Sequence, residues 1–548
     1  MKKSFKYISV LFLIITTGCS DIIDLNSEAN IQAENFYSNY SEIQIGLTGC
    51  YKGLQKPLLQ EWSLTELRSD NTISDTGNSN SVVNQDLSYL DQFYPPTSHL
   101  GNLTYWLSTY NNIRNTNVIL NAVGANYNPA TTAIEYTPIA TSIATGPQCQ
   151  SIAAEASFIR AYHYFNLVRL YGGVFLVDEV LTPTAAKTVN RSSDTDIYKL
   201  IEADLKNAVA YGSTAKYGTS TGDQVGRANS WAAKALLAKV YLTLNRKAEA
   251  IVLLISIKND SGYDLESSYA NVFSTSNEMN KEILFSIRFK SGGVGLGNPL
   301  ANLFAPSNSG NAVVGGDGKG YNLPTTELTS ATFKDASKAL TWDPSVARRS
   351  VNIQLYNNST SYISKFTSKS VLENDAENDF PVIRYSDVLL MLAEAQGNSV
   401  GSMDLINLVH SRDKITPLLP TTATVAVFEK ALSNERRWEF AFENQRWFDL
   451  LRYNTTTATS GTLPAATIVF NGTTYSTPAF TGKVEGAEYK MKNHMNVQTK
   501  VYAKFANTLP LTPVELYNNA RPNRFLLPIP QYEIDTNSNL VINQNPDY

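Results

Sequence analysis

Cysteine and histidine are scarce in this chain. Its 548 residues include only three cysteines and four histidines, His99, His163, His410 and His494. No two histidines have a metal-site spacing such as H-x-x-x-H, and no cysteine pair has zinc-site spacing. A phosphate-binding P-loop and a G-x-S-x-G nucleophile elbow are absent as well. The sequence also lacks an EF-hand loop, which would hold calcium. We therefore expect neither a bound metal nor a cofactor.

The chain also lacks a surplus of either charge. It has 45 Lys and Arg against 49 Asp and Glu, and a net charge of -4. Because there is no basic excess, nucleic acid is not an expected partner. Apolar residues make up 43% of the chain, with 30 Tyr and 22 Phe, so a large core can form and intrinsic disorder is excluded. Abundant Asn, Ser and Thr predict a polar surface that suits neutral ligands.

No apolar run reaches the roughly 20 residues that a membrane-spanning helix needs. The N-terminus instead has a basic start, a short apolar stretch from Tyr7 to Ile15, and then Gly18-Cys19. This pattern is typical of a secretory signal that ends in a lipoprotein cleavage site, although Thr16 stands where leucine is usual. We therefore expect a signal peptide over residues 1–18, lipidation of Cys19, and a polar tether over 19–35.

The other two cysteines, Cys50 and Cys149, leave two alternatives open. An exported protein meets oxidising conditions, so a disulfide between them is chemically allowed. They could equally be buried free thiols that pack as small hydrophobic side chains. The sequence does not fix the distance between them.

Helical periodicity dominates the rest of the chain. It predicts helices near residues 43–54, 106–117, 151–172, 197–208, 231–242, 246–257, 385–397, 402–412 and 426–443. The pair at 231–242 and 246–257, with small residues at its contact, is similar to a tetratricopeptide unit. Alternation predicts a strand over Glu282–Phe289, and an Asn-Gly turn predicts a hairpin over 467–475. Long loops are expected at 69–101, 212–226 and 291–322. The fold class is mainly α with minor β hairpins.

The acidic segment 435–449 is the best acid–base candidate, since a glycosidase needs paired carboxylates. Spacing of three residues, however, lets each carboxylate meet a guanidinium on the same helical face. These pairs are Arg436 with Glu439, Glu443 with Arg446, and Asp449 with Arg446 and Arg452. Paired carboxylates keep low pKa values and make poor general acids. We therefore expect a structural ion-pair network and no enzyme activity. His163, on a helix among aromatic residues, is expected to be packed in the core.

Five ordered blocks of the chain resemble the SusD/RagB family of surface lipoproteins. They are the Glu435–Arg452 run, Trp106…Tyr110…Ile113…Asn117, Ala154–Val174 with its Tyr171-Gly172-Gly173, Arg384–Ala395, and the ending Leu527-Pro528-Ile529-Pro530…Asn543-Gln544-Asn545-Pro546…Tyr548. Asp547 replaces the family's usual glycine. The resemblance spans nearly the whole mature chain.

The resemblance implies one large domain over 36–548, with tetratricopeptide-like helix pairs in an N-terminal part (36–258) and a C-terminal part (259–548). It implies a lipid anchor in the outer membrane, on the cell surface. It also implies a partner, a SusC-like TonB-dependent transporter, to which the protein delivers its ligand. The ligands of the family are mostly oligosaccharides, and for some members peptides. Hence we expect a glycan-binding lipoprotein; the alternatives are an oligopeptide-binding lid of the same transporter type and a surface glycosidase.

The resemblance also implies where the ligand binds, in the loops 68–101 and 291–322. Aromatic faces and planar polar groups are suited to sugars. The candidates are Arg68, Asp70, Asn71, Phe93, Tyr94, His99, Asn298, Phe304, Asp317 and Tyr321. Trp62 and Trp342 are further candidates outside these loops.

Overall fold

The computed structural model describes residues 37–74, 82–219, 225–329, 347–413, 422–452, 466–470, 473–477, 524–537 and 540–548. Cys19, the signal peptide, the tether and Trp342 therefore lie outside the described residues. One connected cluster of buried side chains runs from Ile43 to Ile542 and joins both halves of the chain. The boundary between the two parts, at 258/259, stays a prediction.

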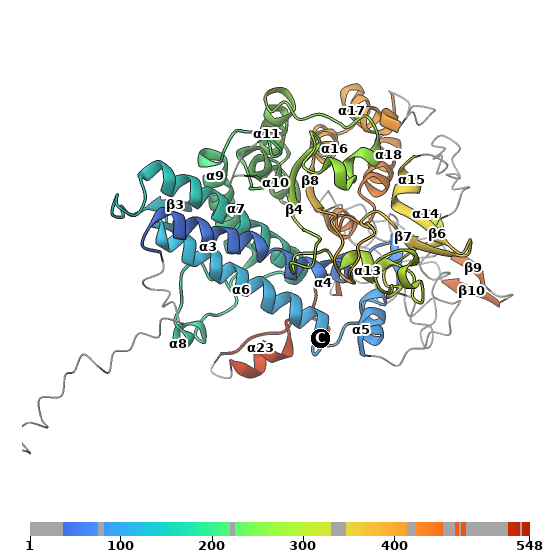
Figure 1. Cartoon of the computed structure of the whole chain (residues 1–548), viewed down its shortest axis with the longest axis horizontal. Coiled ribbons are helices and arrows are strands. Elements are labelled where there is room, and N and C mark those ends of the chain that lie inside the picture. Colours follow the sequence, from blue (N-terminus) through green and yellow to red (C-terminus); the bar gives the residue numbers. More distant parts are fainter. Residues whose placement is uncertain are drawn as a thin grey trace, which may run out of the picture.

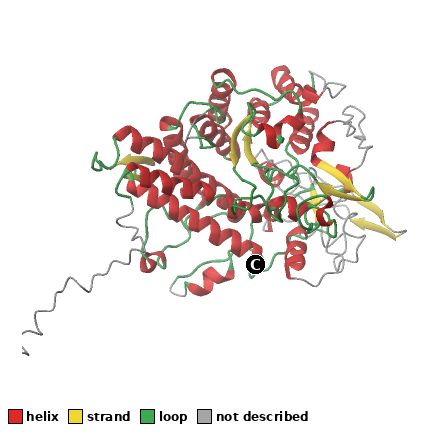
Figure 2. Ribbon diagram, in the orientation of Figure 1, coloured by secondary structure: helices red, strands yellow, loops and turns green. Residues whose placement is uncertain are grey.

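Helices form most of the molecule (Figures 1 and 2). The longer ones are α3 (Tyr40–Lys52), α4 (Gln55–Thr65), α5 (Val82–Asp91), α6 (Leu100–Ala122), α7 (Gly146–Tyr171), α9 (Asp194–Tyr211), α10 (Ser230–Thr243), α11 (Lys247–Asp260), α16 (Tyr385–Gln396), α17 (Val400–His410) and α18 (Val425–Glu439). The shorter ones are α8 (Pro183–Ala186), α12 (Tyr269–Val272), α13 (Leu300–Phe304), α14 (Thr326–Thr329), α15 (Ala347–Asn352), α19 (Arg446–Arg452) and α23 (Gln531–Thr536).

Helix α7 is the centre of the N-terminal half. A capping box between Thr145 and Gln148 begins it, and Gly172, at φ 73°, ends it in a conformation that favours glycine. Most of its side chains are buried on all sides, against α6 and α9. Such an all-round apolar helix is typical of the interior of a large protein.

Successive helices then pack on one another in a continuous series. Helix α9 contacts α10, α10 contacts α11, α11 contacts α16, and α16 contacts α17 and α18 (Figure 1). The predicted antiparallel pair around 231–257 is confirmed as α10 and α11. This stack of helix pairs confirms the mainly α, tetratricopeptide-like fold class.

Strands occur only as two-stranded pairs within the described residues. They are β1 (Thr72–Ile73) with β5 (Leu323–Pro324), β2 (Ala125–Asn128) with β3 (Ala133–Tyr136), β4 (Ile283–Ile287) with β8 (Phe380–Arg384), β6 (Ile353–Tyr356) with β7 (Thr360–Ile363), and β9 (Ala466–Phe470) with β10 (Thr473–Thr477). The predicted strand at 282–289 is confirmed as β4, and Phe470 pairs with Thr473 as the hairpin requires. The Asn471-Gly472 turn itself lies outside the described residues.

Three sequence expectations about loops and helices need correction. The segments 69–101 and 291–322 are not single long loops, because the first contains α5 and the second contains α13. The helix expected over 426–443 ends at Glu439, and Phe442 (φ 69°) and Asn444 (φ 59°) then adopt left-handed backbone. The chain turns there, and α19 begins at Arg446. Residues three apart on either side of this turn are no longer on one helical face.

The blocks that carry the family resemblance hold the scaffold together. Asn117 donates from Nδ2 to the carbonyls of Val177 (2.9 Å) and Glu179 (3.0 Å), and its Oδ1 accepts from Arg160 (2.8 Å). At the other end of the chain, Asn545 donates to the Tyr171 carbonyl at 2.9 Å. Each block therefore fixes a loop or terminus against a helix.

Candidate ligand-binding site

The two loops expected to bind ligand lie side by side. Strand β1 pairs with β5, with Thr72 opposite Pro324, and the Thr325 amide donates to the Asn71 carbonyl at 2.9 Å. Residues about 250 positions apart in sequence thus lie side by side.

An aromatic cluster connects α4 with the second loop. The Trp62 ring stacks on Tyr321, with centroids 6.4 Å apart and planes at 17°, and meets Phe304 edge-on at 5.3 Å. Trp62 and Phe304 are buried, whereas Tyr321 is only half-buried. Of the three rings, Tyr321 is the one that keeps surface for a ligand.

The structure gives Arg68, Asp70 and Asn71 a structural role instead. All three side chains are buried. Arg68 donates to the carbonyls of Arg524 and Phe525 and lies over the Trp447 ring, 4.1 Å from its centroid. Burial lowers the pKa of this guanidinium to about 10.

Asp70 forms an ion pair with Arg446 at 2.7 Å, and Asn71 accepts from Arg437 at 3.0 Å. The guanidinium groups of Arg437 and Arg446 hold the pKa of Asp70 well below its usual range, against the opposing effect of burial. This part of the first loop therefore anchors the α18–α19 segment to the core.

Among the next three candidates, only Tyr94 is exposed. Phe93 is buried against Trp447 with a positive φ of 59°. His99 caps α6, because its Nδ1 accepts from the Asn102 amide at 3.0 Å. Tyr94 is 52% exposed, and the Arg524 guanidinium lies 4.6 Å from its ring centroid. A cation under one face of a ring fixes that ring in place.

In the second loop, Asn298 is fully buried and donates to the Asn378 carbonyl at 2.7 Å. Asp317 is half-buried and accepts from the amides of Gly310 and Gly318 at 2.9 Å. The Gly310 amide is the main reason that the pKa of Asp317 is lowered. Of the ten candidates, Tyr94, Asp317 and Tyr321 keep accessible surface, and the proposed site is narrowed to these three.

The carboxylates of a hypothetical glycosidase lie inside the protein. Glu439 and Glu443 are buried, and Arg384 pairs with both at 2.8 Å. Glu439 also meets Arg412 (2.7 Å) and Arg348 (3.0 Å), and these guanidinium groups hold its pKa well below the usual range despite burial. Neither carboxylate reaches solvent, so neither has the access to substrate that a general acid needs.

The ion-pair network expected over 435–449 is present, but most of its partners come from elsewhere in the chain. Only the Asp449–Arg452 pair, at 2.9 Å, has the expected local spacing. Arg436 pairs with Asp387 and Asp449, Glu443 with Lys365 and Arg384, and Arg446 with Asp70. The three other expected pairs do not form: the turn after Glu439 separates Glu443 from Arg446, whereas Arg436, Glu439 and Arg446 each have partners on other elements. His163 is buried as expected.

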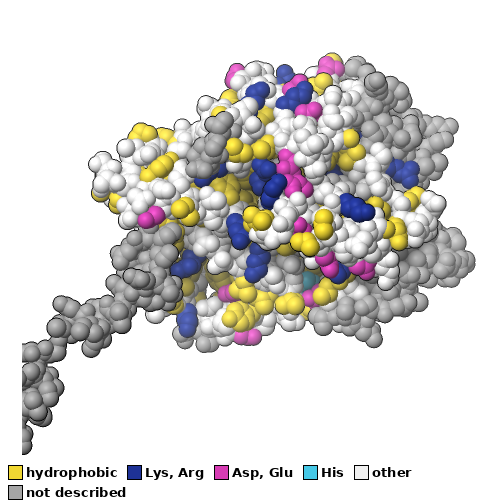
Figure 3. Space-filling model, viewed as in Figure 1, with side chains coloured by type: hydrophobic (Ala, Val, Ile, Leu, Met, Phe, Trp, Pro, Cys, Tyr) yellow, Lys and Arg dark blue, Asp and Glu magenta, His cyan; other side chains and the backbone are white. Residues whose placement is uncertain are grey.

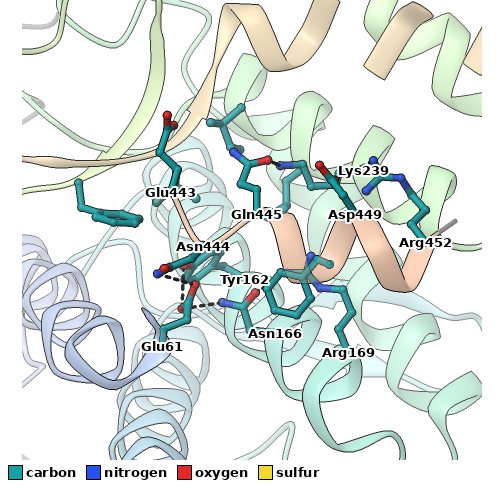
Figure 4. A pocket seen from close by; sticks show the side chains of 15 residues that line it. Glu61, Tyr162, Asn166, Arg169, Lys239, Glu443, Asn444, Gln445, Asp449 and Arg452 are labelled. Carbon is teal, nitrogen blue, oxygen red and sulfur yellow. Dashed lines mark hydrogen bonds and ion pairs between the residues drawn. The ribbon is translucent and has the colours of Figure 1, made fainter. Parts of the chain in front are cut away.

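A polar cavity of about 40 Å³ lies between α4, α7 and the turn before α19 (Figure 4). Glu61 accepts there from Asn166 at 3.2 Å and from Tyr162 at 3.3 Å. Burial raises the pKa of Glu61 to about 7. A space of this size holds one or two water molecules but not a sugar.

A larger hollow opens between the α3–α4 junction and α6. Its volume is about 420 Å³, and its lining combines small, polar and basic side chains, with Leu107 as the main apolar one. The lining residues are Gly49, Lys52, Gly53, Lys56, Thr104, Leu107, Ser108, Asn111 and Asn112. Figure 3 shows Lys and Arg side chains on this face, where Figure 1 places the α3–α4 junction.

This hollow was missed in reading the sequence, because the nearly balanced charge of the whole chain hides a local basic group. A signal is nonetheless present: glycine at 49 and 53 alternates with lysine at 52 and 56. In the structure, Lys52 ends α3, Gly53 follows it, and Lys56 lies in the first turn of α4.

Neither a membrane-spanning helix nor a metal-binding cluster is present in the described part of the chain. None of the described helices combines the length and apolar character that crossing a bilayer requires. Across the same part of the chain, no group of three or more His, Cys, Asp or Glu side chains could hold a metal ion. Cys50 and Cys149 are both free and buried, which favours the small-hydrophobe alternative over the disulfide.

The fold defines a class: helical-repeat scaffolds in which two loops distant in sequence lie side by side. Two family models match this chain, "SusD family" over residues 330–548 and "Starch-binding associating with outer membrane" over residues 23–242. The chain belongs to the SusD/RagB family.

Relatives and solved structures agree with this assignment. SusD-like protein P25 of Formosa agariphila is 26% identical over 488 residues, covering 81% of this chain and 88% of the relative. A laminarin-binding SusD-like protein has a TM-score of 0.66 at 21% identity, covering 93% of this chain and 100% of its own. Surface glycan-binding protein A of Bacteroides thetaiotaomicron, solved with laminarihexaose, has a TM-score of 0.64 at 17% identity, with coverages of 92% and 99%. At these identities the structural likeness establishes the fold.

Proposed function

We propose that this protein is a lipid-anchored, cell-surface oligosaccharide-binding protein that delivers its ligand to a SusC-like TonB-dependent transporter. The observation that carries the proposal is the meeting of two distant loops at β1 and β5, beside the half-exposed Tyr321. Membership of the SusD/RagB family supports it, as do the laminarin and laminarihexaose ligands named for two similar structures.

The available side chains suit a sugar. Tyrosine offers a flat apolar face with little conformational entropy to lose, and both Tyr321 and Tyr94 are held in place by a neighbouring group. Asp317 adds a carboxylate that can accept from sugar hydroxyls. These three residues are the proposed ligand contacts.

The protein binds its ligand without cleaving it. Burial of Glu439 and Glu443 within ion pairs removes the carboxylates that the sequence offered for hydrolysis. We therefore propose a binding role and not a glycosidase activity.

Titration calorimetry against a panel of oligosaccharides tests this proposal. We expect binding of at least one glycan, and weakening of about tenfold when Tyr321→Ala or Tyr94→Ala removes a stacking ring. Tyr211→Ala is the matched control, since Tyr211 is 41% exposed on α9. Absence of binding across the panel, with binding of oligopeptides instead, would contradict the proposal.

Cell fractionation tests the anchor and partner. The native chain should sediment with the outer membrane and co-purify with a TonB-dependent transporter. Cys19→Ala should release the protein into the soluble fraction, because the acyl chains provide the membrane affinity. Incorporation of labelled fatty acid that persists in the Cys19→Ala chain would contradict lipidation at this residue, and this readout does not depend on retention by the transporter.

A further inference from the structure

We propose that the hollow between the α3–α4 junction and α6 is a subsite for an acidic sugar residue, one that carries a carboxylate or sulfate group. This inference rests on the proposed function and narrows its ligand class. Neither the aromatic cluster nor the candidate residues of the two loops contribute to this hollow.

The size and position of the hollow fit a small ligand. Its volume of about 420 Å³ falls within the range of roughly 300–1,000 Å³ that is usual for small-molecule sites. It lies on the outer face of α6, where Leu107 is 43% exposed.

The charges in the hollow select for an anion. Lys52 and Lys56 are exposed and form no ion pair with any residue that the structure describes. None of the described residues that line the hollow is acidic. Arg114, also exposed, follows Asn111 by three positions and so lies on the same face of α6. Two lysines therefore line this hollow, with Arg114 further along the same face of α6, in a protein whose net charge is negative.

Two glycines shape this hollow: Gly49 leaves the backbone of α3 open, and Gly53 allows a close approach to Asn112. A Cβ at Gly49 would meet no atom within 4 Å, so the space beside it is empty. A Cβ at Gly53 would lie 1.9 Å from Oδ1 of Asn112, a contact that no side chain tolerates. The glycine at 53 therefore brings the chain directly against Asn112.

Asn112 provides a buried polar atom without a partner. Its side chain is 1% exposed, and its Nδ2 donates to the Cys50 carbonyl (3.0 Å) and to His163 Nε2 (2.8 Å). Burial lowers the pKa of His163 to about 3, so the ring is neutral and its Nε2 accepts. Both amide hydrogens are thus used, while Oδ1 has no partner and faces Gly53.

Unpaired cations beside accessible polar side chains suit a ligand with both hydroxyl groups and an anionic group. An acidic sugar has both: its carboxylate or sulfate pairs with Lys52 and Lys56, and its hydroxyls meet Thr104 and Asn111, which line the same hollow. A neutral sugar would leave the lysines unused, and a simple anion would leave Thr104 and Asn111 unused.

Titration calorimetry with a galacturonate hexamer and its carboxyl-reduced, neutral counterpart tests the inference. We expect the acidic hexamer to bind more tightly, and Lys52→Gln/Lys56→Gln to weaken it by about tenfold or more without affecting the neutral hexamer. Gly49→Leu should fill the hollow and abolish this preference, and it should fold normally because the space is empty. The control is Lys187→Gln/Lys258→Gln, which removes two exposed lysines elsewhere.

The outcomes separate this inference from the proposed function. Equal affinity for both hexamers, or a preference for the acidic one that survives both Lys52→Gln/Lys56→Gln and Gly49→Leu, would overturn the acidic subsite and leave glycan binding intact. Binding of inorganic phosphate that depends on these lysines, without binding of the acidic hexamer, would also overturn it. Absence of binding to every glycan would instead count against the proposed function.

Discussion

Replacing Arg384 with methionine should cause a large loss of stability. Arg384 is fully buried and pairs with Glu282 (2.7 Å), Glu439 (2.8 Å) and Glu443 (2.8 Å). Its position at the end of β8 places it beside β4, since Ile283 pairs with Arg384. Methionine fills a similar volume, so the main effect is the loss of charge.

The size of this loss depends on which cations remain beside the three carboxylates. Glu282 and Glu439 keep Arg412, and Glu443 keeps Lys365. Each carboxylate therefore retains at least one cation, and the cost corresponds to one broken buried ion pair, about 3–5 kcal/mol, rather than three. Arg384→Lys should be intermediate, because lysine keeps the charge but not the planar fork that serves several oxygens.

Urea unfolding followed by tryptophan fluorescence measures the change in the free energy of unfolding. Arg246→Met is the control: Arg246 pairs with Glu202 and Glu249, but its side chain is 34% exposed. An exposed pair contributes at most about 1 kcal/mol. If Arg384→Met destabilised the protein by no more than Arg246→Met, the view that this buried network stabilises the C-terminal part would be refuted.

Two further perturbations test the buried polar groups. Because the pKa of Glu61 is raised to about 7, the folded state binds its proton more tightly than the unfolded chain, and stability falls as the pH rises from 4.5 to 7. The free energy of unfolding of Glu61→Gln, measured by urea titration and compared with that of the wild type, should therefore rise by about 3 kcal/mol from pH 4 to pH 8. If this difference between variant and wild type were the same at both pH values, the raised pKa of Glu61 would be refuted. Burial raises the pKa of Cys50 to about 12, and Cys149 is also buried, so neither thiol should react with a thiol reagent in the folded protein. In a chain that lacks residues 1–19, and therefore Cys19, the reagent should titrate two thiols once urea unfolds the protein. If no thiol reacted in urea, the two cysteines would form a disulfide.

The helices could be predicted because each buries a periodic face in a shared core. The period around Phe158 and Phe165 locates α7 correctly, and Gly172 marks its end. The ten-residue helix α5 was not predicted, because turn-forming residues precede and follow it within the segment 69–101. Helix α7 begins five residues earlier than expected, because the capping box at Thr145 starts it ahead of the first periodic apolar residues.

The partners of buried charges could not be predicted from local spacing. Arg446 meets Asp70, 376 residues earlier, because two left-handed residues turn the chain between α18 and α19. Polar loop residues pose the same difficulty: Asp70 and Asn298 resemble sugar contacts in sequence, yet both hold loops in place. Only the tertiary structure separates these from the exposed Tyr94.

The central claim is that this protein binds an oligosaccharide and releases it unchanged. The most direct test is calorimetric titration of the folded chain with an oligosaccharide that it binds, followed by mass analysis of the sugar recovered from the same sample after prolonged incubation. We predict saturable binding and recovery of the sugar at its original length. Recovery of shortened products, or absence of binding to any glycan under conditions where the chain is folded, would contradict the claim.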